Sequence, residues 1–164
     1  MKKKVLVLLI IAILAAVPAM AASTRGAAED GSIGVGLNLG TNSGLGLKFG
    51  MGKFDIFANV GLSVISGTGL GVDAGVSYEV YDADFGGGHH MPITVGIMVP
   101  MSFRWNDPFA WDLGILAQVG LEYQIPDVPV LFYLRVGLGA NLNIAPSFKP
   151  DVGGSGNIGV LYVF

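Results

Sequence analysis

The chain has 164 residues, of which 52% are hydrophobic and only 13% are charged. A soluble domain usually carries about 25% charged residues, so this composition favours a membrane protein of a single domain. Glycine contributes 26 residues without a collagen triplet, and the apolar residues between the glycines exclude a disordered chain. A net charge of −3 argues against nucleic-acid binding, and the absence of cysteine excludes disulfides and a lipobox anchor.

The first 21 residues are predicted to be a cleaved signal peptide. Three lysines at positions 2–4 precede an apolar run over 5–17, and Ala19-Met20-Ala21 matches a small-x-small cleavage site. A membrane anchor needs roughly 20 apolar residues, and this run is shorter. We therefore expect a short N-terminal segment over 22–30, followed by one domain over 31–164, with six basic residues against twelve acidic ones after cleavage.

Alternation with a period of two is the strongest pattern after the leader. In the segment 111–125, every odd position is apolar, whereas the even positions are polar or glycine apart from one leucine. Such alternation is typical of strands that separate a lipid-facing side from a polar interior. Similar patterns occur over 33–39, 45–51, 54–64, 70–80, 93–105, 130–142 and 158–164.

These segments predict an all-β fold, an eight-stranded antiparallel up-and-down transmembrane β-barrel. Closure satisfies the backbone hydrogen bonds that an open sheet would leave unpaired in lipid. A soluble barrel, such as a lipocalin-like carrier, is the rival, because it would place the apolar face inside. The small lumen of an eight-stranded barrel suits the glycine-rich face better than the aromatic one, and the low charge favours lipid outside.

Aromatic residues gather near the strand ends, as expected for two girdles at the membrane interfaces. Those assigned to the girdles are Phe49, Phe54, Phe103, Trp105, Trp111, Tyr123 and Phe132. With both chain ends in the periplasm, the surface loops fall at 41–43, 66–67, 106–110 and 144–155, and the periplasmic turns near 52, 82–90 and 126–129. The last surface loop, with Phe148, Lys149 and Asp151, is the expected contact for another molecule.

The polar face predicts a network of charges inside the barrel, made by Lys48, Asp55, Asp73, Glu79, Arg104, Asp112, Glu122 and Arg135. A hairpin symmetric about Pro108 places Arg104 opposite Asp112 and Trp105 opposite Trp111. A turn at 51–52 places Lys48 opposite Asp55 and Phe49 beside Phe54. Arg135 is left near the middle, where Glu122, Asp73 and Glu79 are its possible partners, because buried charges need partners.

The end of the chain, Gly159-Val160-Leu161-Tyr162-Val163-Phe164, resembles the last strand of bacterial outer-membrane proteins. This resemblance implies that Tyr162 and Phe164 are the signal read by the barrel-assembly machinery. The chain after the leader resembles the small eight-stranded OmpA-like/OmpX-like barrel superfamily. The resemblance implies a location in the outer membrane of a Gram-negative bacterium, with outer-membrane lipids as neighbours, and it brings no catalytic motif.

Three functions remain open on the sequence. The first is a structural or envelope-integrity role, or a surface-interaction role with an unknown ligand, for a barrel plugged by ion pairs. The second is a narrow pore for ions or small solutes, and the third and most remote is an outer-membrane lipid-modifying enzyme. Adjacent His89 and His90 lie in a glycine-rich turn without a serine, and two histidines are too few for a defined zinc site. We therefore expect no enzyme activity, no cofactor and no metal site.

Overall fold

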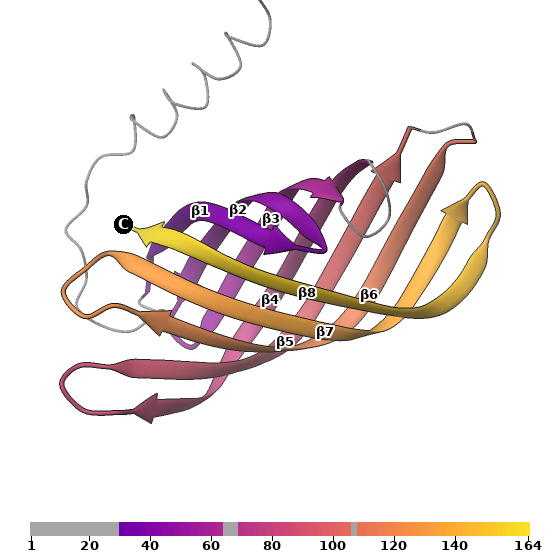
Figure 1. Ribbon diagram of the computed structural model, residues 1–164. Coiled ribbons are helices and arrows are strands. Elements are labelled where there is room, and N and C mark those ends of the chain that lie inside the picture. The colour runs from indigo at the N-terminus through magenta and orange to yellow at the C-terminus, as the bar shows by residue number, and fades with distance from the viewer. Residues whose placement is uncertain (1–29, 64–68, 106–107) are drawn as a thin grey trace, which may run out of the picture.

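The protein folds as a closed ring of eight antiparallel strands connected in chain order (Figure 1). The computed structural model describes residues 30–63, 69–105 and 108–164, so the predicted signal peptide and the expected loop at 66–67 lie outside the described residues. Each strand pairs with its sequence neighbours, and β1 closes the barrel against β8. The strands are β1 (Ile33–Gly40), β2 (Asn42–Met51), β3 (Phe54–Ser63), β4 (Gly69–Asp84), β5 (His90–Arg104), β6 (Ala110–Gln124), β7 (Val130–Ala145) and β8 (Lys149–Val163).

The apolar series of each strand lies on the outside of this barrel, and the polar and glycine series lies inside. On β6, Ile115, Val119 and their odd-numbered neighbours are exposed or half-buried, whereas Asp112, Gln118 and Glu122 are buried. The other strands repeat this arrangement. The predicted assignment of the two faces is therefore confirmed, and the lipocalin-like arrangement, with its apolar face inside, is wrong.

The wall of the barrel is uneven. Strands β1, β2 and β3 have 8–10 residues, whereas β4 to β8 have 15 or 16. We call β1–β3 the low wall and β4–β8 the tall wall. Both described ends of the chain lie at one end of the barrel, and we call the opposite end the mouth (Figure 1). β1 pairs with β8 only as far as Asn157, so the first half of β8 stands above the low wall.

Three connections are shorter than the sequence pattern predicts. β2 begins at Asn42, so the expected loop at 41–43 is reduced to Thr41. β8 begins at Lys149 rather than 158, so Lys149 and Asp151 lie in a strand and only Phe148 belongs to the connection from β7. The expected loop over 144–155 is therefore wrong. Its glycines weaken the strand signal, but this half of β8 is held in register by pairing with β7. At the other end, β4 and β5 extend into the expected 82–90 turn, and a bulge near Val80 keeps them paired.

The two hairpin registers differ from the predicted ones by two residues. Phe103, not Trp105, lies opposite Trp111, and Met51, not Phe49, lies opposite Phe54. Because side chains alternate between the two faces with a period of two, a shift of two residues leaves every side chain on its predicted face. The β2–β3 turn is a tight one at Gly52 and Lys53, with Gly52 at φ 65°.

Interior glycines make room for large side chains from neighbouring strands. A Cβ at Gly159 would lie 2.4 Å from the ring of Tyr133, and one at Gly75 would lie 2.5 Å from the ring of Phe57. The rings therefore lie flat across the strands that carry the glycines. No helix among the described residues is long and apolar enough to span a membrane.

Candidate functional site in the barrel interior

Four charged side chains meet in the middle of the barrel. Lys48 on β2 pairs with Asp55 on β3 at 3.2 Å and with Glu122 on β6 across the lumen. Glu122 also accepts a hydrogen bond from Arg135 Nη2 at 2.9 Å. All four side chains are almost fully buried. Two positive and two negative charges thus balance one another where solvation by water is lost.

Arg135 is held by aromatic rings as well as by charge. Its guanidinium lies 4.1 Å from the centre of the Phe57 ring and 4.4 Å from that of Tyr133. Cation–π attraction of this kind is worth about 2 kcal/mol when desolvated. Arg135 therefore fixes the positions of Phe57 and Tyr133 as well as Glu122, and these groups close the centre of the barrel.

A third buried carboxylate, Asp73 on β4, is surrounded by amides. Asn42 Nδ2 donates to Asp73 Oδ1 at 2.6 Å, and Asn157 Nδ2 donates to Asp73 Oδ2 at 3.2 Å. Asn38 donates to Asn157 at 3.2 Å and accepts from the Tyr133 hydroxyl at 2.7 Å. No ion pair among the described residues reaches Asp73. Its charge is stabilised by hydrogen bonds alone.

Apolar side chains fill the rest of the interior. Leu131, Tyr133, Leu161 and Val163 form a cluster toward the end that carries the chain termini. Phe57, Met98 and Leu116 form another, and each of these three is at most 1% exposed. With the charges and amides between them, these clusters occupy the lumen through most of its length.

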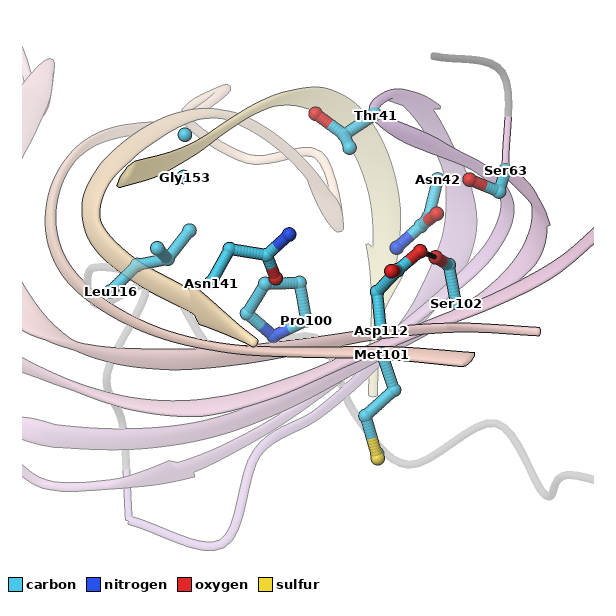
Figure 2. A pocket seen from close by; sticks show the side chains of 11 residues that line it. Thr41, Asn42, Ser63, Pro100, Met101, Ser102, Asp112, Leu116, Asn141 and Gly153 are labelled. Carbon is cyan, nitrogen blue, oxygen red and sulfur yellow. Dashed lines mark hydrogen bonds between the residues drawn. The ribbon is translucent and has the colours of Figure 1, made fainter. Parts of the chain in front are cut away.

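The mouth holds a third polar group and a small cavity (Figure 2). Asp112 Oδ2 on β6 accepts from Arg104 Nη2 at 2.8 Å and from Ser102 Oγ at 3.0 Å. Beside it lies a cavity of about 70 Å³, lined by residues of both walls. Asn42 and Ser63 reach it from the low wall, whereas Ser102, Asp112 and Asn141 reach it from the tall wall.

The predicted charge network thus occurs as separate groups. Three predicted contacts are present: Lys48 with Asp55, Arg104 with Asp112, and Arg135 with Glu122. Asp73 belongs to the amide group, and Glu79 is half-buried near the terminal end without an ion pair among the described residues. Sequence reasoning missed the buried amides, although each lies on the inward-facing series of its strand; among the described residues they are Asn38, Asn42, Asn59, Gln118 and Asn157.

The two histidines lie in separate contacts at the terminal end. His89 Nδ1 lies 2.8 Å from the Tyr123 hydroxyl, and His90 Nδ1 lies 2.8 Å from Asp82 Oδ2. Within residues 30–63, 69–105 and 108–164, no group of three or more His, Cys, Asp or Glu residues is arranged to hold a metal ion. The histidines therefore act here as partners within the β4–β5 hairpin and toward β6.

The aromatic residues predicted to form girdles lie near the two ends of the strands. Phe54 packs against Tyr78 with ring centres 4.8 Å apart, and Phe103 stacks on Trp111 at 5.9 Å. At the chain end, the rings of Tyr162 and Phe164 are 4.7 Å apart. Trp105 lies beyond the end of β5 and is exposed. Phe49, Phe132 and Tyr123 lie toward the terminal end, on the outer series.

No known protein family, no curated protein and no solved structure matches this chain in comparisons of sequence and fold.

Proposed function

We propose that this protein is an integral barrel of a bacterial outer membrane, exported with a cleaved signal peptide and inserted by the barrel-assembly machinery. Its role is structural, in envelope integrity or in contact with a molecule at the surface, and its lumen is plugged. In architecture the protein would then resemble the OmpA-like/OmpX-like superfamily of small barrels. Tyr162 and Phe164 would then be the assembly signal.

The observation that carries the proposal is the contrast between the two sides of one sheet. The outer side exposes leucine, isoleucine, valine and phenylalanine around the whole ring, including Leu37, Ile56, Ile97, Ile115, Leu138 and Ile158. Monomeric soluble proteins rarely expose continuous apolar surface of this extent. The inner side holds seven charged side chains that each contact another polar group: Lys48, Asp55, Asp73, Arg104, Asp112, Glu122 and Arg135. Lipid outside and a polar interior is the arrangement that bilayer insertion requires.

A pair of lysine substitutions tests the membrane location. Val119→Lys places a charge on the outer face in the middle of β6, where Val119 is 56% exposed. At a bilayer midplane a lysine costs about 2–4 kcal/mol. Val152→Lys places the same charge on the outer face of the tall wall near the mouth, where Val152 is 83% exposed and where we expect water.

The full chain and both variants would be expressed in a Gram-negative host. We expect wild type and Val152→Lys in the outer-membrane fraction, with heat-modifiable gel mobility and a mass lacking 21 or 22 residues, and much less folded Val119→Lys. Equal folding of both variants, in a fraction released without detergent, would contradict the membrane location. An intact leader on folded protein would contradict export by cleavage.

A narrow pore is the second candidate function, and the shared ion pair of Glu122 supports it. Glu122 pairs with both Lys48 and Arg135, so a change of partners could open the centre of the barrel. Against it, Phe57 and Tyr133 also close the centre and hold Arg135 between them. We therefore expect no stable conductance steps from the folded protein in a planar bilayer.

Arg135→Ala separates the plugged barrel from the pore. Removing one partner of a buried ion-pair group costs about 3–5 kcal/mol, so the variant should unfold at lower urea concentration while staying silent in the bilayer. Conductance steps in wild type that change in the variant, at unchanged stability, would favour the pore.

A further inference from the structure

The unequal walls leave part of one strand without a neighbour. β1 pairs with β8 only as far as Asn157, and just beyond it the Thr41 N–H donates to the Gly156 carbonyl at 2.9 Å. From Lys149 to Ser155, β8 pairs with β7 alone among the described strands (Figure 1). Closed barrels normally have no sheet edges, so this stretch, which we call the β8 edge, is an exception.

The hydrogen bonds on either side of β8 show which backbone groups the edge presents. In an antiparallel pair, residues whose N–H and C=O face the neighbouring strand alternate with residues whose groups face away. The Val163 N–H donates to the Pro129 carbonyl, on the side of β7. Gly156 bonds to Thr41, on the side of β1. The β7–β8 pairing keeps one register throughout, so the residues of the edge that face away from β7 are those at 150, 152 and 154.

These three residues offer acceptors but almost no donors. Pro150 has no N–H at all. The Val152 N–H donates to Asp151 Oδ1 at 2.8 Å, so a side chain of the same strand already occupies it. Among the three, only Gly154 keeps its N–H for another strand, because no residue in the described part of the chain accepts from it. Each of the three still presents a carbonyl oxygen.

The edge is open to other molecules. Val152 is 83% exposed, and Pro150, Asp151 and Gly154 are exposed as well. An exposed strand edge is a template for pairing with another chain, and the edge of a second copy is always present in the same solution. With Val152 of both copies opposite each other, complete pairing needs the N–H groups at 150, 152 and 154 of each copy. The wild-type chain supplies only one of them, so most carbonyl oxygens would face no donor.

We propose that the β8 edge is protected against pairing with a second copy of this chain, and that Pro150 and Asp151 are the residues that protect it. Pro150 withholds one donor and Asp151 occupies another, within the stretch that has no strand beside it. A barrel with uneven walls can thereby remain a separate molecule. The edge has this property with or without a membrane around the barrel, and whatever the role proposed above.

Restoring the donors tests the protection. Sedimentation equilibrium of the folded protein, in a detergent matched in density to the solvent, measures its association. Pro150→Val adds an N–H at the edge, and Asp151→Ala releases the N–H of Val152. Each change adds one hydrogen bond from each copy, so each should strengthen dimerisation on the order of tenfold. The double variant should therefore dimerise on the order of a hundredfold more strongly than wild type, at concentrations where wild type is monomeric.

Lys149→Val is the matched control. It removes a charge from the same strand and adds a β-branched residue, as the two edge substitutions together do, but its N–H faces β7. This variant should stay monomeric. Heat-modifiable gel mobility identifies the variants that still fold, and only these are compared. Equal dimerisation of Lys149→Val and the double variant would mean that charge or apolarity drives association, and this result would overturn the proposal.

Amide hydrogen exchange of the wild-type protein gives a second test that needs no folded variant. The Gly154 amide should exchange fast, whereas the Ser155 amide, which faces β7, should exchange slowly. The Val152 amide should exchange more slowly than that of Gly154 because Asp151 holds it. Slow exchange at Gly154 would mean that another segment covers the edge, and this would overturn the proposal.

Two further results would contradict the protected edge. One is a folded double variant that stays monomeric, since the restored donors would then have no effect. The other is a wild-type protein that dimerises at the same concentrations as the double variant, because Pro150 and Asp151 would then block nothing.

Discussion

Individual glycines decide which side chains the lumen can hold. Tyr133 lies across Gly159, and Met98 ends 2.9 Å from where a Cβ of Gly137 would be. A narrow barrel interior has little room beside an aromatic ring that lies across a strand, so a residue without a side chain at that position lets the ring pack close to the backbone. Part of the glycine content is thus the complement of a few large interior side chains, whereas other glycines, such as Gly36 and Gly139, lie against the backbone of the neighbouring strand.

Two glycines of β8 provide a matched test. Gly159→Ala adds a methyl group 2.4 Å from the Tyr133 ring, whereas Gly156→Ala adds one with nothing within 4 Å. Overpacking of this kind costs about 1–3 kcal/mol, so Gly159→Ala should lower the urea midpoint and Gly156→Ala should leave it nearly unchanged. Equal midpoints would mean that Tyr133 moves aside without cost.

Three charged contacts could be predicted from the sequence, but the Lys48–Glu122 contact across the lumen and the amide cluster could not. Parity placed Lys48, Asp55, Glu122 and Arg135 on one face, and the need of buried charges for partners favoured Lys48 with Asp55 and Arg135 with Glu122. Asparagine carries no charge, so its inward position gave no indication of a partner. The position of Asp73 among amides follows from how strands far apart in sequence meet across the lumen, which no local pattern encodes.

At the level of strands, the faces were predictable and the exact pairings were not. Alternation determines which face a residue occupies, whereas the pairing depends on where the turn lies. Moving the turn by one residue changes the cross-strand partner of every residue in the hairpin. In the β5–β6 hairpin the observed register still lets Arg104 reach Asp112 diagonally and stacks Phe103 on Trp111.

Engineered cysteines report this register directly, because the native chain has none. Phe103→Cys with Trp111→Cys places two thiols on directly paired residues, within the separation of about 4.4–6.8 Å that a disulfide needs between Cα atoms. Trp105→Cys with Trp111→Cys should resist oxidation, because residues out of register by two lie beyond about 7 Å. Loss of maleimide labelling after mild oxidation measures the bond, and preferential oxidation of the second pair would contradict the register.

For the whole molecule, the strand number, connectivity and face assignment followed from the sequence, whereas the heights of the walls did not. Alternation predicted all eight strands. The first half of β8, however, is rich in glycine and contains Pro150, so the sequence pattern predicted a loop there. Its strand conformation comes from pairing with β7, a tertiary effect that overrides local propensity.

The low wall would have a consequence for the surrounding bilayer. Eight residues of β1, tilted as in outer-membrane barrels, rise about 20 Å along the barrel axis, less than the apolar band of about 25 Å that such barrels present. Folding should therefore be faster and more complete in vesicles of short-chain than of long-chain phosphatidylcholine, as followed by heat-modifiable mobility. Equal rates would mean that the outer surface has no thickness preference.

That mismatch falls on one strand only, because the ten residues of β2 or of β3 rise about 25 Å at the same tilt. Lipids beside β1 would have to compress or tilt, while those beside the longer strands would meet a full-height surface, at a cost of fractions of a kcal/mol per ångström. In a membrane the protein would therefore lean, and the leaflet next to β1 would be locally thinned, so that uneven strand length becomes a means of deforming the lipid on one flank.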